Sequence, residues 1–154
     1  MRLSDYMHPD LVFANLRAGS SRDLLDLLAG KVCESYPNLE KTTCLDSLLQ
    51  REREFSTGLE CGIAVPHATV PGVEKTVCVV CTLASPVEIE TTDGIPVRIV
   101  FMLLSPPNAI ANHVRILARI ARLCSLEDFP ARIRAAEDSE SLFQVITEED
   151  QRHV

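Results

Sequence analysis

Four histidines are the scarce side chains of this sequence that can do chemistry near neutral pH: His8, His67, His113 and His153. A neutral imidazole can act as a base, a nucleophile or a metal ligand. His8 lies in the N-terminal arm and His153 is the penultimate residue, so both are expected to be exposed and without a catalytic role. His67 and His113 lie in more structured surroundings and are the candidates.

His67 ends an apolar run over residues 62–66 that closes with Pro66. The run predicts a short strand, and a proline fixes its own φ, so the histidine is delivered from a rigid element. Catalytic side chains are commonly presented in this way at the rim of a sheet. The alternative is a strand-end surface histidine without a task, and the pattern alone does not exclude it.

Two further residues could bind an anion. His113 lies early in the helix expected after Pro106 and Pro107, and a helix start offers free N–H groups and a favourable dipole to a phosphate. Arg51 begins an alternating Arg-Glu run over residues 51–54. Both side chains are also compatible with ordinary exposed helix faces.

The cysteines are expected to be buried core residues and not redox or metal-binding groups. Cys78 and Cys81 have the C-x-x-C spacing of redox and zinc motifs, but they lie in an expected strand over residues 76–83. Residues three apart on a strand point to opposite faces, so these thiols should not meet. Since no second Cys or His pair has zinc spacing, we expect buried free thiols and no metal site.

Composition limits the class of protein. The 154 residues are the size of one domain, and 46% are hydrophobic, enough for a full core. The net charge of −7 argues against nucleic acid as a partner. The longest apolar run, residues 99–104, is too short to cross a bilayer, and the N-terminus lacks a signal-peptide core. We therefore expect a cytoplasmic protein without membrane insertion.

The elements that must position these residues alternate between strand and helix patterns. A strand at residues 11–16 precedes a helix capped at Ser20 and a second helix starting near Thr43. Residues 56–62, with two glycines, predict a loop. The later strands are expected at residues 63–65, 76–83, 87–90 and 97–104.

The last third of the chain predicts helices. In the first of them, the apolar residues Ile110, Val114, Leu117 and Ala121 repeat at helical spacing. Shorter helices are expected over residues 129–136 and 139–146, and a polar tail follows. The order predicts an α/β (α+β) fold, a three-layer α/β/α sandwich with a small mixed sheet. We expect a single domain over residues 1–150 and a polar tail at 151–154.

Taken together, the chemical residues resemble a known signature. Residues 51–58, with Arg51 and the Ser56-Thr57-Gly58 turn, and then residues 62–67 resemble the active-site motif of the type-2 EIIA family of the bacterial phosphotransferase system. Residues 103–106 and the Asn112-His113 pair resemble its second histidine region. The two ends of the chain are most similar to the stand-alone nitrogen-regulatory EIIA proteins.

The resemblance implies roles for these residues. His67 would accept a phosphoryl group from a phosphohistidine on an HPr-like (NPr) phosphocarrier, as nucleophile. His113 would stabilise the phosphoryl oxygens, and Arg51 would neutralise their charge. Ser56 and Thr57 would order the loop or donate to the phosphoryl group. No metal or other cofactor is implied, because the donor is already a phosphohistidine.

The partners follow from the same resemblance. A carrier needs a shallow apolar surface beside His67, to which Ile63, Val65 and Val70 could contribute unless they belong to the core. Regulatory target proteins read the phosphorylation state, and no transporter portion is fused, which favours regulation. The alternatives are a sugar-specific EIIA that passes phosphate to an EIIB for fructose- or mannitol-type uptake, and a non-enzymatic binding module on the same scaffold.

Overall fold

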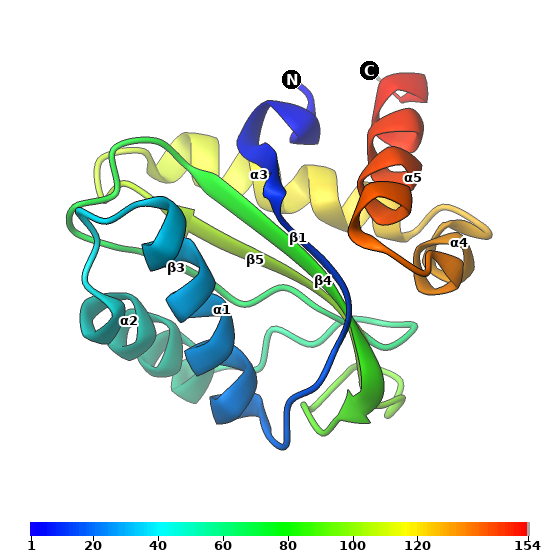
Figure 1. The fold of residues 1–154 in the computed structure, drawn as a ribbon, viewed down its shortest axis with the longest axis horizontal. Coiled ribbons are helices and arrows are strands. Elements are labelled where there is room, and N and C mark those ends of the chain that lie inside the picture. Colours follow the sequence, from blue (N-terminus) through cyan, green and yellow to red (C-terminus); the bar gives the residue numbers. More distant parts are fainter. Residues whose placement is uncertain (154) are drawn as a thin grey trace.

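The computed structural model describes residues 1–153 and is built around a mixed five-stranded sheet (Figure 1). Its order is β1-β4-β5-β2, with β3 also paired to β5. The β4–β5 pair is antiparallel, and the other pairs are parallel. The strands are β1 (Met7–Leu16), β2 (Ile63–Ala64), β3 (His67–Thr69), β4 (Val77–Val87) and β5 (Val97–Ser105).

Helices cover both faces of this sheet (Figure 1). Residues of α1 and α2 form one hydrophobic core with one face, and residues of α3, α4 and α5 form a second core with the other. The predicted three-layer α/β sandwich with a mixed sheet is therefore confirmed. The helical elements are η1 (Leu3–Tyr6), α1 (Ser21–Ser35), α2 (Lys41–Glu54), α3 (Ile110–Cys124), α4 (Phe129–Ala135) and α5 (Ser139–Arg152).

Local sequence signals explain several of these elements. The Ser20 side chain caps α1 by accepting a hydrogen bond from the Asp23 N–H at 3.1 Å, as the sequence predicts. The side chains of Cys78 and Cys81 lie on opposite faces of β4 and are buried in different hydrophobic cores. The C-x-x-C spacing therefore forms no paired site, which confirms the expectation from strand geometry.

Two strand predictions are wrong in detail. The expected separate strand at residues 87–90 does not form, because β4 itself continues to Val87 and residues 88–90 leave the sheet. The sequence also places His67 beyond the end of its strand. The chain instead re-enters the sheet at His67 and forms β3 against β5, after a break at Val65 and Pro66.

The four apolar residues that indicate α3 in the sequence do not form its buried face. Ile110 and Val114 are 62% and 57% exposed. The helix instead packs through His113, Ile116 and Ile120, which are buried. The buried side follows a different apolar stripe that also has helical spacing, Ile116, Ile120, Leu123 and Cys124.

The expected polar tail is partly a helix. Helix α5 continues to Arg152, and Asp150 is fully buried. Its carboxylate pairs with Arg119 of α3 at 2.7 Å and accepts the backbone N–H groups of Leu3 and Ser4. Asp150 therefore ties α5 to α3 and to η1. The division into a domain at 1–150 and a tail at 151–154 stays a prediction, and residue 154 lies outside the described residues.

The cysteines differ in their exposure. Cys44, Cys78, Cys81 and Cys124 are buried, as expected, whereas Cys33 is half-buried and Cys61 is exposed. The expectation of buried thiols is therefore wrong for Cys61.

Over residues 1–153, no helix combines the length and hydropathy needed to span a bilayer.

Candidate functional site

A short break between β2 and β3 presents His67. The Pro66 carbonyl accepts the Leu103 N–H at 2.9 Å, so the break stays attached to β5. The Val65 N–H donates to the Thr57 carbonyl at 3.0 Å, which ties the break to the preceding loop. The two residues before His67 are thus bonded to β5 and to the preceding loop, and the half-buried His67 ring is held on a rigid segment.

The hydrogen bond of His67 defines which ring nitrogen is free. Its Nδ1 lies 2.7 Å from the Val65 carbonyl oxygen. A carbonyl can only accept, so Nδ1 carries the proton. In the neutral ring, Nε2 then holds the lone pair and is the nucleophilic atom.

The second histidine lies beside the first. The ring centroids of His67 and His113 are 5.3 Å apart, with their planes inclined by 52°. His113 is buried, with 7% exposure, in the first turns of α3. Its Nδ1 lies 2.6 Å from Oγ of Ser105, the last residue of β5. The structure therefore brings together two histidines that are distant in sequence.

Both rings are held in the neutral form. Burial lowers the pKa of His67, opposed by the hydrogen bond that His67 donates to the Val65 carbonyl and assisted by the Arg51 charge. Burial, then the neighbouring His67 and the Arg51 charge, lower the pKa of His113 to about 4. At neutral pH the pair therefore consists of two uncharged rings.

Arg51 supplies the positive charge of the site. It lies in the last turn of α2, and its guanidinium donates to the Phe55 carbonyl at 3.0 Å. This contact satisfies a carbonyl at the helix end, where a cation is also favoured by the helix dipole. Its charge acts on both histidine rings. The structure thus brings together Arg51, His67 and His113.

The hydroxyls of Ser56 and Thr57 are engaged within the protein. Ser56 Oγ donates to the Glu90 carbonyl and accepts the Gly58 N–H. Thr57 is buried and donates to the Glu52 carboxylate. These contacts favour the loop-ordering role that was one of the two expectations for these residues.

Two glycines of the motif are required by close backbone contacts. A Cβ at Gly58 would lie 2.0 Å from the Glu90 carbonyl oxygen. Gly62 has a φ of +69°, and a Cβ there would lie 2.7 Å from the Pro96 carbonyl oxygen. The loop before β2 can therefore lie against residues 90–96 only with glycine at both positions.

The sequence interpretation did not identify Ser105 and Thr76 as site residues. Both are buried, and Thr76 Oγ1 lies 3.1 Å from Ser105 Oγ. The signal that could have found them is the pairing of two antiparallel strands: when residue 77 pairs with residue 104, residue 76 lies opposite residue 105. That register was not available from the pattern of hydrophobic residues.

The apolar surface beside the histidines differs from the expected one. Ile63, Val65 and Val70 are buried, so they belong to the core, the alternative that the sequence left open. The exposed apolar side chains here come from Ile110 and Val114 of α3, in the same helix turns as His113. These two residues form what we call the α3 apolar patch.

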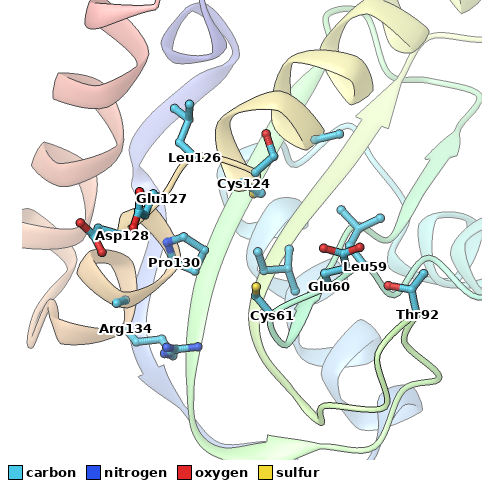
Figure 2. Close-up of a pocket in the computed structure, with 14 residues that line it drawn as sticks. Leu59, Glu60, Cys61, Thr92, Cys124, Leu126, Glu127, Asp128, Pro130 and Arg134 are labelled. Carbon is cyan, nitrogen blue, oxygen red and sulfur yellow. The ribbon is translucent and has the colours of Figure 1, made fainter.

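A cavity of about 590 Å³ opens elsewhere on the same side of the sheet, between residues 59–63 and the α3–α4 connection (Figure 2). Figure 2 shows Cys61, Cys124, Pro130 and Arg134 around it. His67, His113 and Arg51 do not line it. The histidine pair therefore lies outside this cavity.

Within residues 1–153, no group of three or more His, Cys, Asp or Glu side chains is placed to hold a metal ion. The charges that act on the His67 ring are those of Arg51, which repels cations, and Glu52, which attracts them.

The sheet, its two helical layers and the histidine pair at its edge define the class of phosphotransferase-system EIIA domains. The chain belongs to the EIIA type-2 family: the model described as "Phosphoenolpyruvate-dependent sugar phosphotransferase system, EIIA 2" matches residues 5–149. The resemblance noted from the sequence is therefore confirmed.

The relatives place it near the nitrogen-regulatory branch. It is 35% identical over 146 residues to a nitrogen regulatory protein of Bradyrhizobium diazoefficiens, covering 95% of each chain. A fructose-specific EIIA component of Haloferax volcanii is 31% identical over 134 residues, covering 86% of this chain and 83% of that one. The crystal structure of nitrogen regulatory protein IIA-Ntr from Neisseria meningitidis superposes with a TM-score of 0.86 at 25% identity, covering 94% and 99%.

Proposed function

We propose that this protein is a cytoplasmic phosphorelay component that accepts a phosphoryl group on Nε2 of His67 from a phosphohistidine of an HPr-like (NPr) carrier. Its phosphorylation state then regulates its binding to target proteins. Membership of the EIIA type-2 family and the similarity to nitrogen regulatory proteins support this role. In the transfer, the bond between phosphorus and the carrier's ring breaks as the bond to Nε2 forms.

One observation carries the proposal. The 2.7 Å hydrogen bond from His67 Nδ1 to the Val65 carbonyl leaves the lone pair on Nε2, in a ring kept neutral by burial. A neutral imidazole with one free nitrogen is a competent nucleophile without prior loss of a proton. The break between β2 and β3 therefore prepares His67 before the carrier arrives.

The surrounding groups match the charge of the transferred phosphoryl group. Its transition state is loose, with negative charge spread over the equatorial oxygens. The Arg51 guanidinium is the cation that acts on both rings. His113, with its ring centroid 5.3 Å from that of His67, is near enough to donate to one of these oxygens. Ser56 and Thr57 contribute by ordering the loop between Arg51 and β2.

The α3 apolar patch suits a protein donor. The carrier must bring its own ring to within about 3–3.5 Å of an attack geometry, which requires a shallow surface. Exposed Ile110 and Val114 supply apolar contact area beside His113. The net charge of −7 favours encounter with a carrier that has a basic rim.

Phosphorylation of His67 would change how target proteins bind to the same surface. A phosphoryl group on His67 adds about −1.5 to −2 charge next to the α3 apolar patch. A target that docks through apolar contacts would then lose affinity, whereas a target with a basic contact would gain it. Phosphorylation thereby becomes a binding signal.

The test uses phosphoenolpyruvate, Enzyme I, an HPr-like carrier and the intact protein, followed by intact-mass measurement. We expect the mass of one phosphate, labile in acid and stable in alkali, on the native protein and none on His67→Ala. His8→Ala is the matched control and should be phosphorylated like the native chain. Absence of phosphate with several carriers would leave the binding-module alternative, an EIIA scaffold without transfer.

The sugar-specific alternative is supported by the fructose-specific relative of Haloferax volcanii. In that case the phosphoryl group would pass from His67 to an EIIB for fructose- or mannitol-type uptake. Adding candidate EIIB proteins to the phosphorylated protein separates the two roles. Rapid loss of phosphate to an EIIB favours transport, and retention of phosphate favours regulation.

A further inference from the structure

Hydrogen bonds link His113 of the histidine pair to two further buried polar side chains, Ser105 and Thr76. Thr76 Oγ1 lies 3.1 Å from Ser105 Oγ, and Ser105 Oγ lies 2.6 Å from His113 Nδ1. Their exposed fractions are 4%, 0% and 7%. Buried polar groups in an apolar layer are costly unless their hydrogen bonds are satisfied, so the direction of each bond matters.

The sheet register places the two hydroxyls together on the side of α3. Cys78 of β4 pairs with Leu103 of β5, and both belong to the core under α3. Thr76 and Ser105 lie two residues further along their strands in opposite directions, so they face the same layer. The first turns of α3 then bring His113 onto Ser105.

The number of available acceptors decides the direction of these bonds. Within residues 1–153, the bond to Ser105 is the only side-chain hydrogen bond found for Thr76. If Thr76 donates to Ser105, Ser105 can donate to His113 Nδ1, and both hydroxyl protons are used. In the reverse order His113 Nδ1–H donates to Ser105, Ser105 donates to Thr76, and the buried Thr76 proton has no acceptor. The first arrangement is therefore favoured.

We propose that Ser105, itself oriented by Thr76, is a positioning residue that fixes His113 in the tautomer with its proton on Nε2. This inference rests on the proposed function, because it assigns His113 as a hydrogen-bond donor to the phosphoryl group on His67. The two neighbouring rings then hold opposite tautomers: His67 is held by a carbonyl acceptor and presents a lone pair, and His113 is held by a hydroxyl donor and presents an N–H.

This arrangement has a direct chemical consequence. Nε2–H of His113 can donate to a phosphoryl oxygen as negative charge develops, and it needs no protonation of the ring to do so. The other tautomer would present a lone pair to the same anion and repel it. Ser105 thus decides whether His113 helps or opposes the transfer, although it need not touch the phosphoryl group.

The native protein provides the first test, without any carrier or phosphate. Long-range ¹H–¹⁵N spectra of ¹⁵N-histidine-labelled protein near neutral pH distinguish ring nitrogens with and without a proton. We expect the proton on Nε2 for His113 and on Nδ1 for His67. A proton on Nδ1 of His113 overturns the proposal.

Variants supply the second test. In Ser105→Ala, His113 loses the donor at Nδ1, so its spectrum should show a mixture of tautomers, and phosphotransfer should slow by about 10- to 100-fold. Thr76→Val should shift the tautomer mixture less, and Thr76→Ser, which keeps the hydroxyl, should restore the native spectrum. Thr82→Val is the matched control: Thr82 is also buried in β4, but its hydroxyl accepts from the Asn15 N–H.

The two measurements separate this proposal from the proposed function. A native protein that accepts phosphate while Ser105→Ala keeps the native tautomer and rate refutes the role of Ser105 alone. A protein that shows the expected tautomers but accepts no phosphate refutes the phosphorelay while leaving the Ser105–His113 geometry intact. If Ser105→Ala does not fold, the native spectrum and the Thr76 pair still decide.

Discussion

The ring centroids of His67 and His113 lie 5.3 Å apart and come from two elements that are distant in sequence, β3 in the sheet and α3 packed against it. Burial disfavours the charged form of both rings, and the neighbouring ring and the Arg51 charge further disfavour a proton on His113. The pair is therefore neutral where phosphotransfer must occur.

The first prediction concerns Arg51. Replacing it with methionine keeps the aliphatic stem but removes the charge, so phosphotransfer to His67 should slow by about 100-fold or more while the fold is kept. Arg53→Met is the matched control, because Arg53 is exposed two residues further along α2. Rapid-quench measurement of phosphoprotein formation checks this. Equal rates for the two variants would exclude a role for Arg51.

The second prediction concerns pH. The pKa of His113 is about 4 in the folded protein, compared with 6.5 for an unperturbed ring. Between these values the unfolded chain binds the extra proton, so stability must fall as the pH decreases from 7. The free energy of unfolding should drop by about 2 kcal/mol between about pH 7 and pH 5 from this residue alone. Denaturant titrations of the native protein and of His113→Gln check it, since the variant should lose this part of the decrease.

The third prediction concerns the buried ion pair. Asp150→Ala leaves the Arg119 charge buried and removes the acceptor for the Leu3 and Ser4 N–H groups. The cost should be about 3–5 kcal/mol. Glu148→Ala, on an exposed face of the same helix, should change stability by less than about 0.5 kcal/mol. Thermal unfolding of both variants decides, and similar melting temperatures would contradict the structural role of Asp150.

The fourth prediction concerns the α3 apolar patch. Ile110→Glu should leave stability nearly unchanged, because the side chain is 62% exposed. If the carrier docks there, the KM for the phosphorylated carrier should rise by about tenfold or more, with a smaller change in kcat. Ile95→Glu, another exposed apolar position, is the control. A KM equal to that of the native protein would place the carrier elsewhere.

Parts of this fold could be predicted from the sequence because their signals are local. The Ser20 cap, the β-branched strand around Cys78 and Cys81, and the apolar run before His67 each specify one element through nearby residues. The Ser20 cap and the strand around Cys78 and Cys81 form as predicted, whereas the run before His67 forms the short strand β2 and then a break. The motif resemblance likewise depends on contiguous residues.

What could not be predicted depends on contacts between distant segments. The contact of His113 with Ser105 joins the start of α3 to the end of β5, whereas Ile110 and Val114 are exposed. The end of α5 is helical because Arg119 and the η1 backbone satisfy Asp150. A hydrophobicity pattern treats Asp150 as a surface residue, so it does not predict this buried carboxylate.

The central claim is that Nε2 of His67 is the atom that receives the phosphoryl group. The most direct measurement is a long-range ¹H–¹⁵N spectrum, with ³¹P detection, of the histidine-labelled protein after phosphorylation by the carrier. The structure predicts a phosphorus bond to Nε2 of His67, with the Nδ1 side still facing Val65. Phosphate on Nδ1 of His67, or on any other residue, would contradict the account.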